Sequence, residues 1–235
     1  MISLRSIAIS VFGAALSAPP TYSQDLSRYR EFQLGTNLPA VAKQMRVKPS
    51  EAKTIHKRPA AIQELERQAP FTDSARRADS VRNILFRFYN GELYCLVVTY
   101  DEERTEGMTT EDLVEAVSAK YGTATRPDAE IILSSTHLFG DGDKMISDRS
   151  EKVIARWEDS QYSFNLFRHS SEATFGLVVY SKRLDDLARA AIVESVRLDK
   201  QEAPQREIES RKKKDEENRA RQEKARRANK APFRP

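Results

Sequence analysis

The sequence contains few of the residues on which the common catalytic and metal sites depend. It has one cysteine and three histidines in 235 residues, and it holds no glycine-rich phosphate loop and no Gly-x-Ser-x-Gly nucleophile motif. The histidines, His56, His137 and His169, stand far apart, and none pairs with a carboxylate or cysteine at ligand spacing. We therefore expect exposed loop or helix histidines, no metal site and no cofactor.

The single cysteine, Cys95, excludes a disulfide within the chain, so packing alone has to hold the core together. Cys95 lies in the middle of an apolar stretch, which predicts a buried and unreactive thiol. A nucleophilic cysteine would instead need a basic, partly exposed environment.

Two acidic stretches share some features with cation sites. Residues 101–103 form an acidic run directly after a predicted strand, where a cation or a basic partner would bind, although a solvated turn explains the run more simply. Asp141, Asp143 and Asp148 begin like a calcium loop, but the EF-hand spacing, glycine and closing glutamate are missing. Neither stretch is therefore predicted to bind metal.

The first 23 residues have the organisation of a secretory signal peptide. Arg5 supplies a positive charge, residues 7–16 are apolar but too few to span a bilayer, and Thr21 and Ser23 are the small residues before the expected cleavage site. A buried N-terminal helix is the alternative. We expect an exported chain, periplasmic or extracellular, with no transmembrane segment in its mature form.

The positive charge belongs to the C-terminal tail rather than to the body of the chain. The net charge is +4, and residues 199–235 contain thirteen Lys and Arg against eight Asp and Glu. The basic composition therefore does not describe the domain, and we expect no nucleic-acid partner.

The tail itself is predicted to form a long charged helix. It contains six acid-before-base pairs four residues apart, which favour a helix: Glu202–Arg206, Glu207–Arg211, Glu209–Lys213, Asp215–Arg219, Glu217–Arg221 and Glu223–Arg227. Pro204 should kink or restart this helix. Ile208 is almost the only large apolar residue before Phe233, so no coiled-coil seam is expected.

A functional tail would contact an anionic surface, such as lipid headgroups, a cell-wall polymer or an acidic protein. The expected contact residues are Lys212, Lys213, Lys214, Arg226 and Arg227. The alternative is a disordered tail that only improves solubility.

Hydrophobic patterning between residues 24 and 198 predicts a globular domain. Strands at 84–89 and 93–98 flank Asn90 and Gly91, the preferred pair for a two-residue type I′ turn. The second strand is apolar on both faces, so it should be central in a sheet.

Strands near 153–157, 162–166 and 175–179 are expected to form a three-strand meander, followed by a helix from Leu184.

Two earlier helices are marked by their capping residues. Asn37 caps a helix at 37–46, and Thr109 and Gly122 bound one at 109–121. A short helix is expected from Ser50 to Pro59, then a weakly predicted strand at residues 60–66. Residues 123–150 are expected to be a long loop with one short strand. The two helices each precede strands containing "LVVTY" or "LVVY", which suggests two helix-then-sheet units in one sheet; chance similarity of apolar strands is the alternative.

The sequence thus predicts a signal peptide (1–23), an α+β domain (24–198) and a charged tail, largely helical or disordered (199–235). The domain is expected to hold an antiparallel sheet, made of a hairpin and a three-strand meander, with helices packed on one face. A long charged C-terminal helix completes the prediction.

The stretches "YREFQLGTNLPAVAKQM", "LFRFYNGELYCLVVTY" and "EDLVEAVSAKYG" resemble a pattern found in uncharacterised exported bacterial proteins. Their order is similar to the tandem helix-plus-sheet fold of the β-lactamase inhibitor protein and of small outer-membrane-assembly lipoproteins. The resemblance covers residues 29–198 and its motifs are structural. It implies a non-enzymatic, protein-binding module. The lipoprotein cysteine is missing here, so membrane anchoring is not implied.

Three functions follow as hypotheses. The first is a non-enzymatic envelope or periplasmic protein that binds an unidentified protein partner. The second is binding of an anionic surface or polymer through the basic tail. The third is an enzyme of unrecognised type, which would require carboxylates such as Asp101, Glu103 and Glu158 to converge in a cleft.

Overall fold

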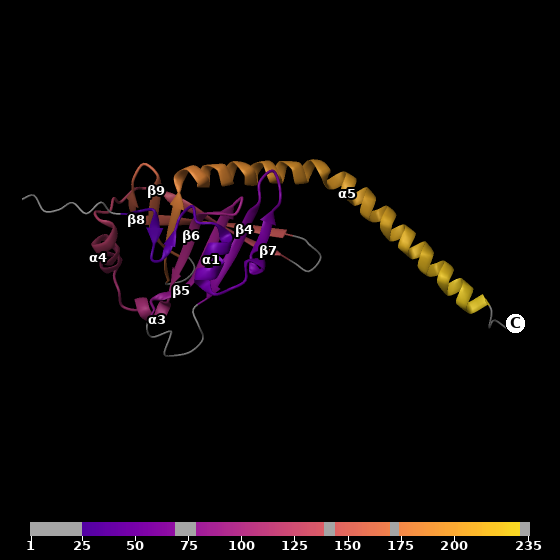
Figure 1. The fold of residues 1–235 in the computed structure, drawn as a ribbon, viewed down its shortest axis with the longest axis horizontal. Helices are drawn as coiled ribbons and strands as arrows, with labels where there is room; N and C mark the ends of the chain where they lie inside the picture. Colours follow the sequence, from indigo (N-terminus) through magenta and orange to yellow (C-terminus); the bar gives the residue numbers. More distant parts are fainter. Residues whose placement is uncertain (1–24, 69–78, 139–143, 170–173, 231–235) are drawn as a thin grey trace, which may run out of the picture.

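The structure is a computed structural model that describes residues 25–68, 79–138, 144–169 and 174–230 (Figure 1). The predicted signal peptide and the aspartates Asp141 and Asp143 lie outside these residues.

The strands are β1 (Arg28–Tyr29), β2 (Phe32–Gln33), β3 (Lys53–His56), β4 (Ile62–Gln68), β5 (Val81–Tyr89), β6 (Glu92–Tyr100), β7 (Glu130–Leu138), β8 (Lys144–Glu158), β9 (Tyr162–Arg168) and β10 (Phe175–Ser181). The helices are α1 (Leu38–Met45), the 3₁₀ helix η1 (Pro49–Glu51), α3 (Glu102–Thr105), α4 (Thr110–Tyr121) and α5 (Lys182–Lys230).

The main sheet consists of two four-stranded antiparallel meanders joined edge to edge. Its strand order is β3-β4-β5-β6-β10-β9-β8-β7, and a separate two-stranded sheet pairs β1 with β2. The first meander runs from one edge of the sheet (β3) to its centre (β6), and the second runs from the other edge (β7) to the centre (β10). The main sheet therefore has a two-fold arrangement. The α+β prediction is confirmed, but the three-strand meander was inexact because β7 extends it and β3 and β4 extend the hairpin in the same way.

The two meanders meet at the strands that carry the similar sequences. Val97 pairs with Val178, and Leu96 with Val179 on one side of them. The "LVVTY" of β6 and the "LVVY" of β10 therefore occupy corresponding places about this pair. α1 precedes the first meander and α4 the second, which is the arrangement expected for two helix-then-sheet units.

Local sequence signals account for the turn and the helix ends. Asn90 (φ 49°) and Gly91 (φ 82°) both have positive φ, as a type I′ turn requires. The side chain of Asn37 accepts a hydrogen bond from the Ala40 N–H at 2.9 Å and caps α1. Thr109 caps α4 in a reciprocal capping box with Asp112. These predictions are confirmed.

Helices cover both faces of the main sheet, which corrects the prediction of helices on one face. On one face, residues of α1 and α4 join the core around Phe86, Phe164 and Trp157. On the other, Leu184 and Ala188 of α5 pack in the cluster that contains Tyr94, Cys95, Phe167 and Val178. The physical reason is β6, whose side chains are apolar on both sides and must be shielded from water on both.

Two further predictions are wrong. Residues 123–150 contain a long hairpin in which β7 pairs with β8 from Glu130↔Lys152 to Leu138↔Lys144. The outer stretches of the two strands, "SSTHL" and "KMISD", show little alternation of apolar and polar residues, so the sequence does not indicate strands there. The helix predicted from Ser50 is instead η1 followed by the short edge strand β3, because only Ile55 and His56 of β3 are buried.

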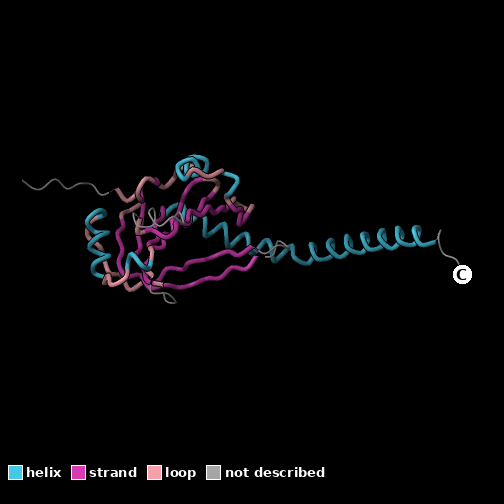
Figure 2. Tube along the Cα trace, turned by 90° about the horizontal axis from the view of Figure 1, so that it is seen from below, coloured by secondary structure: helices cyan, strands magenta, loops and turns pink. Residues whose placement is uncertain are grey.

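The C-terminal helix α5 has a packed half and an exposed half. Leu184, Ala188, Ala191 and Ser195 are buried at intervals of three or four residues. Residues 203–230 are all exposed. The helix continues through Pro204 without restarting, and both views show it changing direction part way along and leaving the domain (Figures 1 and 2). Such a bend is expected at a proline, which cannot donate the backbone hydrogen bond.

In the described part of the chain, no helix combines the length and the apolar character needed to cross a membrane. α5 has the length, but its second half is dominated by charged residues.

A close contact between β9 and β10 gives the first prediction. Phe167 pairs with Gly176, and a Cβ on Gly176 would lie 2.2 Å from Cζ of the buried Phe167 ring. Gly176→Ala should therefore destabilise the domain by about 1–3 kcal/mol through overpacking, measured by urea unfolding. In a double-mutant cycle with Phe167→Leu, most of that loss should disappear. An equal loss with and without the Phe167 ring would contradict the assigned contact.

Candidate functional site

The five predicted contact residues lie on the exposed half of α5, here called the arm (residues 203–230). Lys212, Lys213, Lys214, Arg226 and Arg227 are all exposed. The structure brings none of them to the domain, and Arg227 forms an ion pair with Glu223 one turn away. Since consecutive helix residues point about 100° apart, these five side chains spread around the helix and do not form one basic face.

Of the six predicted acid–base pairs, two form ion pairs in the described residues. These are Glu202–Arg206 at 3.2 Å and Glu223–Arg227. Arg206 also binds Asp199 at 2.6 Å, and Glu202 binds Arg58, which lies just after β3. Exposed pairs of this kind contribute little stability, because water screens the attraction between the charges. The Arg58–Glu202 pair matters more for position, because it joins the arm's base to the domain.

A buried hydrogen bond fixes α5 to the edge of the sheet. Ser195 Oγ lies 2.7 Å from His56 Nδ1, and each residue is only 4% exposed. The expectation of an exposed His56 is therefore wrong, because β3 turns this side chain under α5. His169 is also largely shielded, with Nδ1 3.4 Å from the Glu151 carboxylate. The His137 side chain lies outside the description.

Charged side chains also lie between α5 and the sheet. Arg87 of β5 donates to Glu64 of β4 at 3.0 Å, and both side chains are 14% exposed. Asp185 of α5 is buried and accepts from Arg189 at 2.6 Å. Burial raises the pKa of Asp185, and Arg189 offsets part of this effect.

The thiol of Cys95 lies in the same layer. Burial raises its pKa to about 12. The prediction of a buried cysteine is confirmed, and the raised pKa favours the protonated thiol, which is the less reactive form.

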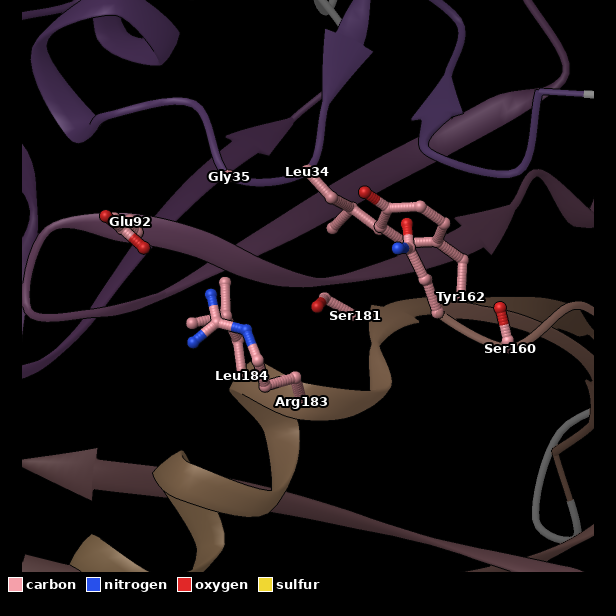
Figure 3. A pocket seen from close by; sticks show the side chains of 9 residues that line it. Leu34, Gly35, Glu92, Ser160, Tyr162, Ser181, Arg183 and Leu184 are labelled. Atoms are coloured by element: carbon pink, nitrogen blue, oxygen red, sulfur yellow. The ribbon is translucent and has the colours of Figure 1, made fainter.

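A pocket of about 320 Å³ lies where β10 runs into α5 (Figure 3). Leu34 comes from the segment after β2, Glu92 from the start of β6, Tyr162 from the start of β9, and Ser181 and Arg183 from the junction. Four separate parts of the chain thus build one pocket, and the labelled polar side chains surround a common space (Figure 3).

The neighbouring lysine is already engaged and does not belong to the pocket's free groups. Lys182 Nζ lies 2.8 Å from the Glu158 carboxylate and donates to the Asp159 carbonyl at 2.7 Å. Its backbone N–H donates to the Gln161 carbonyl at 2.9 Å. These contacts fasten the first residue of α5 to the turn before β9 and hold the pocket wall in place.

A second pocket, of about 440 Å³, lies at the opposite end of the β6–β10 pair. Glu102, Glu103 and Glu106 give it an acidic rim, opposite Arg168 and Phe175. The predicted acidic run is thus partly structural, since its first residue, Asp101, caps α3.

The carboxylates that a catalytic cleft would need are not gathered. Glu103 lies at the second pocket, next to the α3 cap Asp101. Glu158 pairs with Lys182 at the other end of the central strands. Nor do three or more His, Cys, Asp or Glu side chains of the described residues come together as metal ligands would.

Sequence reasoning missed the pocket at the start of α5 entirely. Its residues carry no motif, and they meet only because β6 and β10 are antiparallel neighbours. The nearest signal in the sequence is the direct passage from an apolar strand into a helix at Ser181, which leaves a helix N-terminus at the end of a central strand.

Comparison with known proteins assigns no relatives: no family model matches the chain, and no curated protein or solved structure matches it. Function therefore has to be inferred from the arm, its anchor and the two pockets.

The buried Asp185 gives a prediction about pH. Because its pKa is raised on folding, the native state holds this proton at a higher pH than the unfolded chain does. The stability that Asp185 contributes is therefore complete below its unfolded pKa, near 3.9, and decreases as pH rises through the folded pKa. Asp185→Asn should match the native chain at about pH 3 and be more stable at pH 7, measured by urea unfolding. Arg189→Gln is the matched control, and a less stable Asp185→Asn variant at pH 7 would overturn the assignment.

Proposed function

We propose that this chain is an exported, non-enzymatic interaction protein that contacts a protein partner of the cell envelope through its helical arm. The observation that carries the proposal is the continuous helix that is buried in the domain at one end and fully exposed from residue 203 to residue 230. Export is inferred from the features of residues 1–23, and the non-enzymatic character from the resemblance to tandem helix-plus-sheet binding proteins.

The anchored half of α5 gives the arm a defined direction. Leu184 and Ala188 pack on the sheet, the His56–Ser195 bond holds the helix further along, and Arg58–Glu202 holds it just before the arm begins. A helix that is polar all round does not stabilise its own domain. The arm leaves the domain in a fixed direction, and this is what it needs in order to contact a partner at a distance from the domain.

The charge pattern of the arm favours a protein partner over a lipid surface. The arm contains eleven Lys and Arg and six Asp and Glu, and both signs are distributed around the helix. A membrane-bound amphipathic helix needs an apolar face opposite its basic face, and Ile208 is the only large apolar residue of the arm. A partner with a largely acidic but mixed surface fits this distribution better than a uniformly anionic bilayer.

The test is a crosslinked pull-down from the native envelope with the mature chain. A chain ending at Ala203 retains every described contact between α5 and the domain. It should capture at least about tenfold less of the partner than the full chain does. Capture by the full chain should weaken as salt is raised from low to physiological strength and beyond.

Two matched variants separate charge from helix length. In the first, Gln replaces Lys212, Lys213, Lys214, Arg226 and Arg227. In the second, Gln replaces Glu207, Glu209, Glu216, Glu217 and Glu223. Only the first should lose the partner. Full capture by the chain ending at Ala203 would show that the sheet domain is the binding surface. Capture of anionic vesicles at equal strength would favour the lipid alternative. Either result contradicts the proposal.

A further inference from the structure

The pocket at the start of α5 is rich in hydrogen-bond donors that no described residue uses. The first N–H groups of a helix have no acceptor within the helix, and of these only the Lys182 N–H has its acceptor, the Gln161 carbonyl. The N–H groups of Arg183 and Leu184 follow at the pocket wall. A helix N-terminus of this kind favours an anionic group.

Ser181 adds an independent sign of a ligand. The residue is only 8% exposed, and its hydroxyl forms no hydrogen bond within the described part of the chain. Figure 3 shows this hydroxyl directed into the space between Leu34 and the Arg183 side chain. Because Ser181 lines the pocket, this hydroxyl is free to donate a hydrogen bond to a group bound there.

Two opposite charges face the same space without meeting. Glu92 and Arg183 both line the pocket, and neither forms an ion pair with any described residue. Glu92 begins β6 and Arg183 follows the end of β10, so both lie at the same end of this antiparallel strand pair. A simple anion would suffer repulsion from Glu92, whereas a ligand that carries both charges would satisfy both side chains.

We propose that this pocket binds a small zwitterion of the amino-acid type, a free amino acid or the end of a short peptide. The carboxylate lies at the N-terminus of α5 against the Ser181 hydroxyl and the Arg183 guanidinium, and the ammonium group lies against Glu92. Leu34 and Leu184 line the pocket for an apolar side chain. The volume of about 320 Å³ falls at the lower end of the range for small-molecule pockets, roughly 300–1,000 Å³.

The proposal goes beyond the interaction function and does not depend on it, since every pocket residue belongs to the domain and none to the arm. The second pocket offers an internal comparison. It has a similar size, but three glutamates stand on its rim against the single Arg168, so a carboxylate would meet net repulsion there.

The probe is the dipeptide L-alanyl-L-alanine, titrated into the mature full-length chain by calorimetry and by backbone amide shifts. We expect a dissociation constant on the order of 1 mM or below and the largest shifts at residues 181–184. Arg183→Gln and Ser181→Ala should each weaken binding about tenfold. Arg211→Gln, which removes an exposed arginine of the arm, should leave binding unchanged.

The two ends of the ligand are tested separately. Acetylating the dipeptide's amine should weaken binding about tenfold in the native chain and have no further effect in Glu92→Gln. Inorganic phosphate, an anion without an ammonium group, should bind at least about tenfold more weakly than the dipeptide. Thermal unfolding of each variant shows that the fold is intact. Absence of dipeptide binding, equal binding of phosphate, or equal weakening by Arg211→Gln would overturn the proposal.

Discussion

The pairing of β6 with β10 is the contact on which the rest of the structure depends. It joins two meanders into one sheet whose central strands are apolar on both sides. With a single cysteine, the chain has no disulfide to compensate for an uncovered face. Both faces therefore need helices, and α5 supplies the second cover because β10 runs into it without a break. The pocket at that junction and the course of the arm are consequences of this passage.

Much of the fold is predictable because short-range chemistry defines it. The positive-φ pair Asn90 and Gly91, the Thr109 cap and the two-sided apolar β6 all have local signals. The β7–β8 hairpin is different, since its ladder is made by backbone groups that every residue possesses. Its polar outer part gives no periodicity to detect. The sequence also fails to predict the edge strand β3. This strand has four residues with two buried side chains, a pattern that fits a turn of helix equally well.

The candidate site was predictable only where it is continuous in sequence. The exposed basic residues of the arm follow from composition and pair spacing. The pocket does not, because Glu92 and Arg183 come to it through the pairing of two strands whose partner residues lie more than 75 positions apart in the sequence. His56 was placed wrongly for the same reason: its partner Ser195 lies 139 residues away. Long-range pairing of polar residues leaves no local pattern, so only tertiary structure reveals it.

The continuity of α5 also has a mechanical consequence. The arm of 28 residues is about 40 Å long when helical, so it acts as a lever on the sheet. A pull at its far end is borne first by Arg58–Glu202 and then by His56–Ser195. Lys182 and the pocket lie at the opposite end of the packed half. The packed half of α5 would thus detach from the sheet stepwise, from β3 toward β10. The contacts around the pocket would be the last to break.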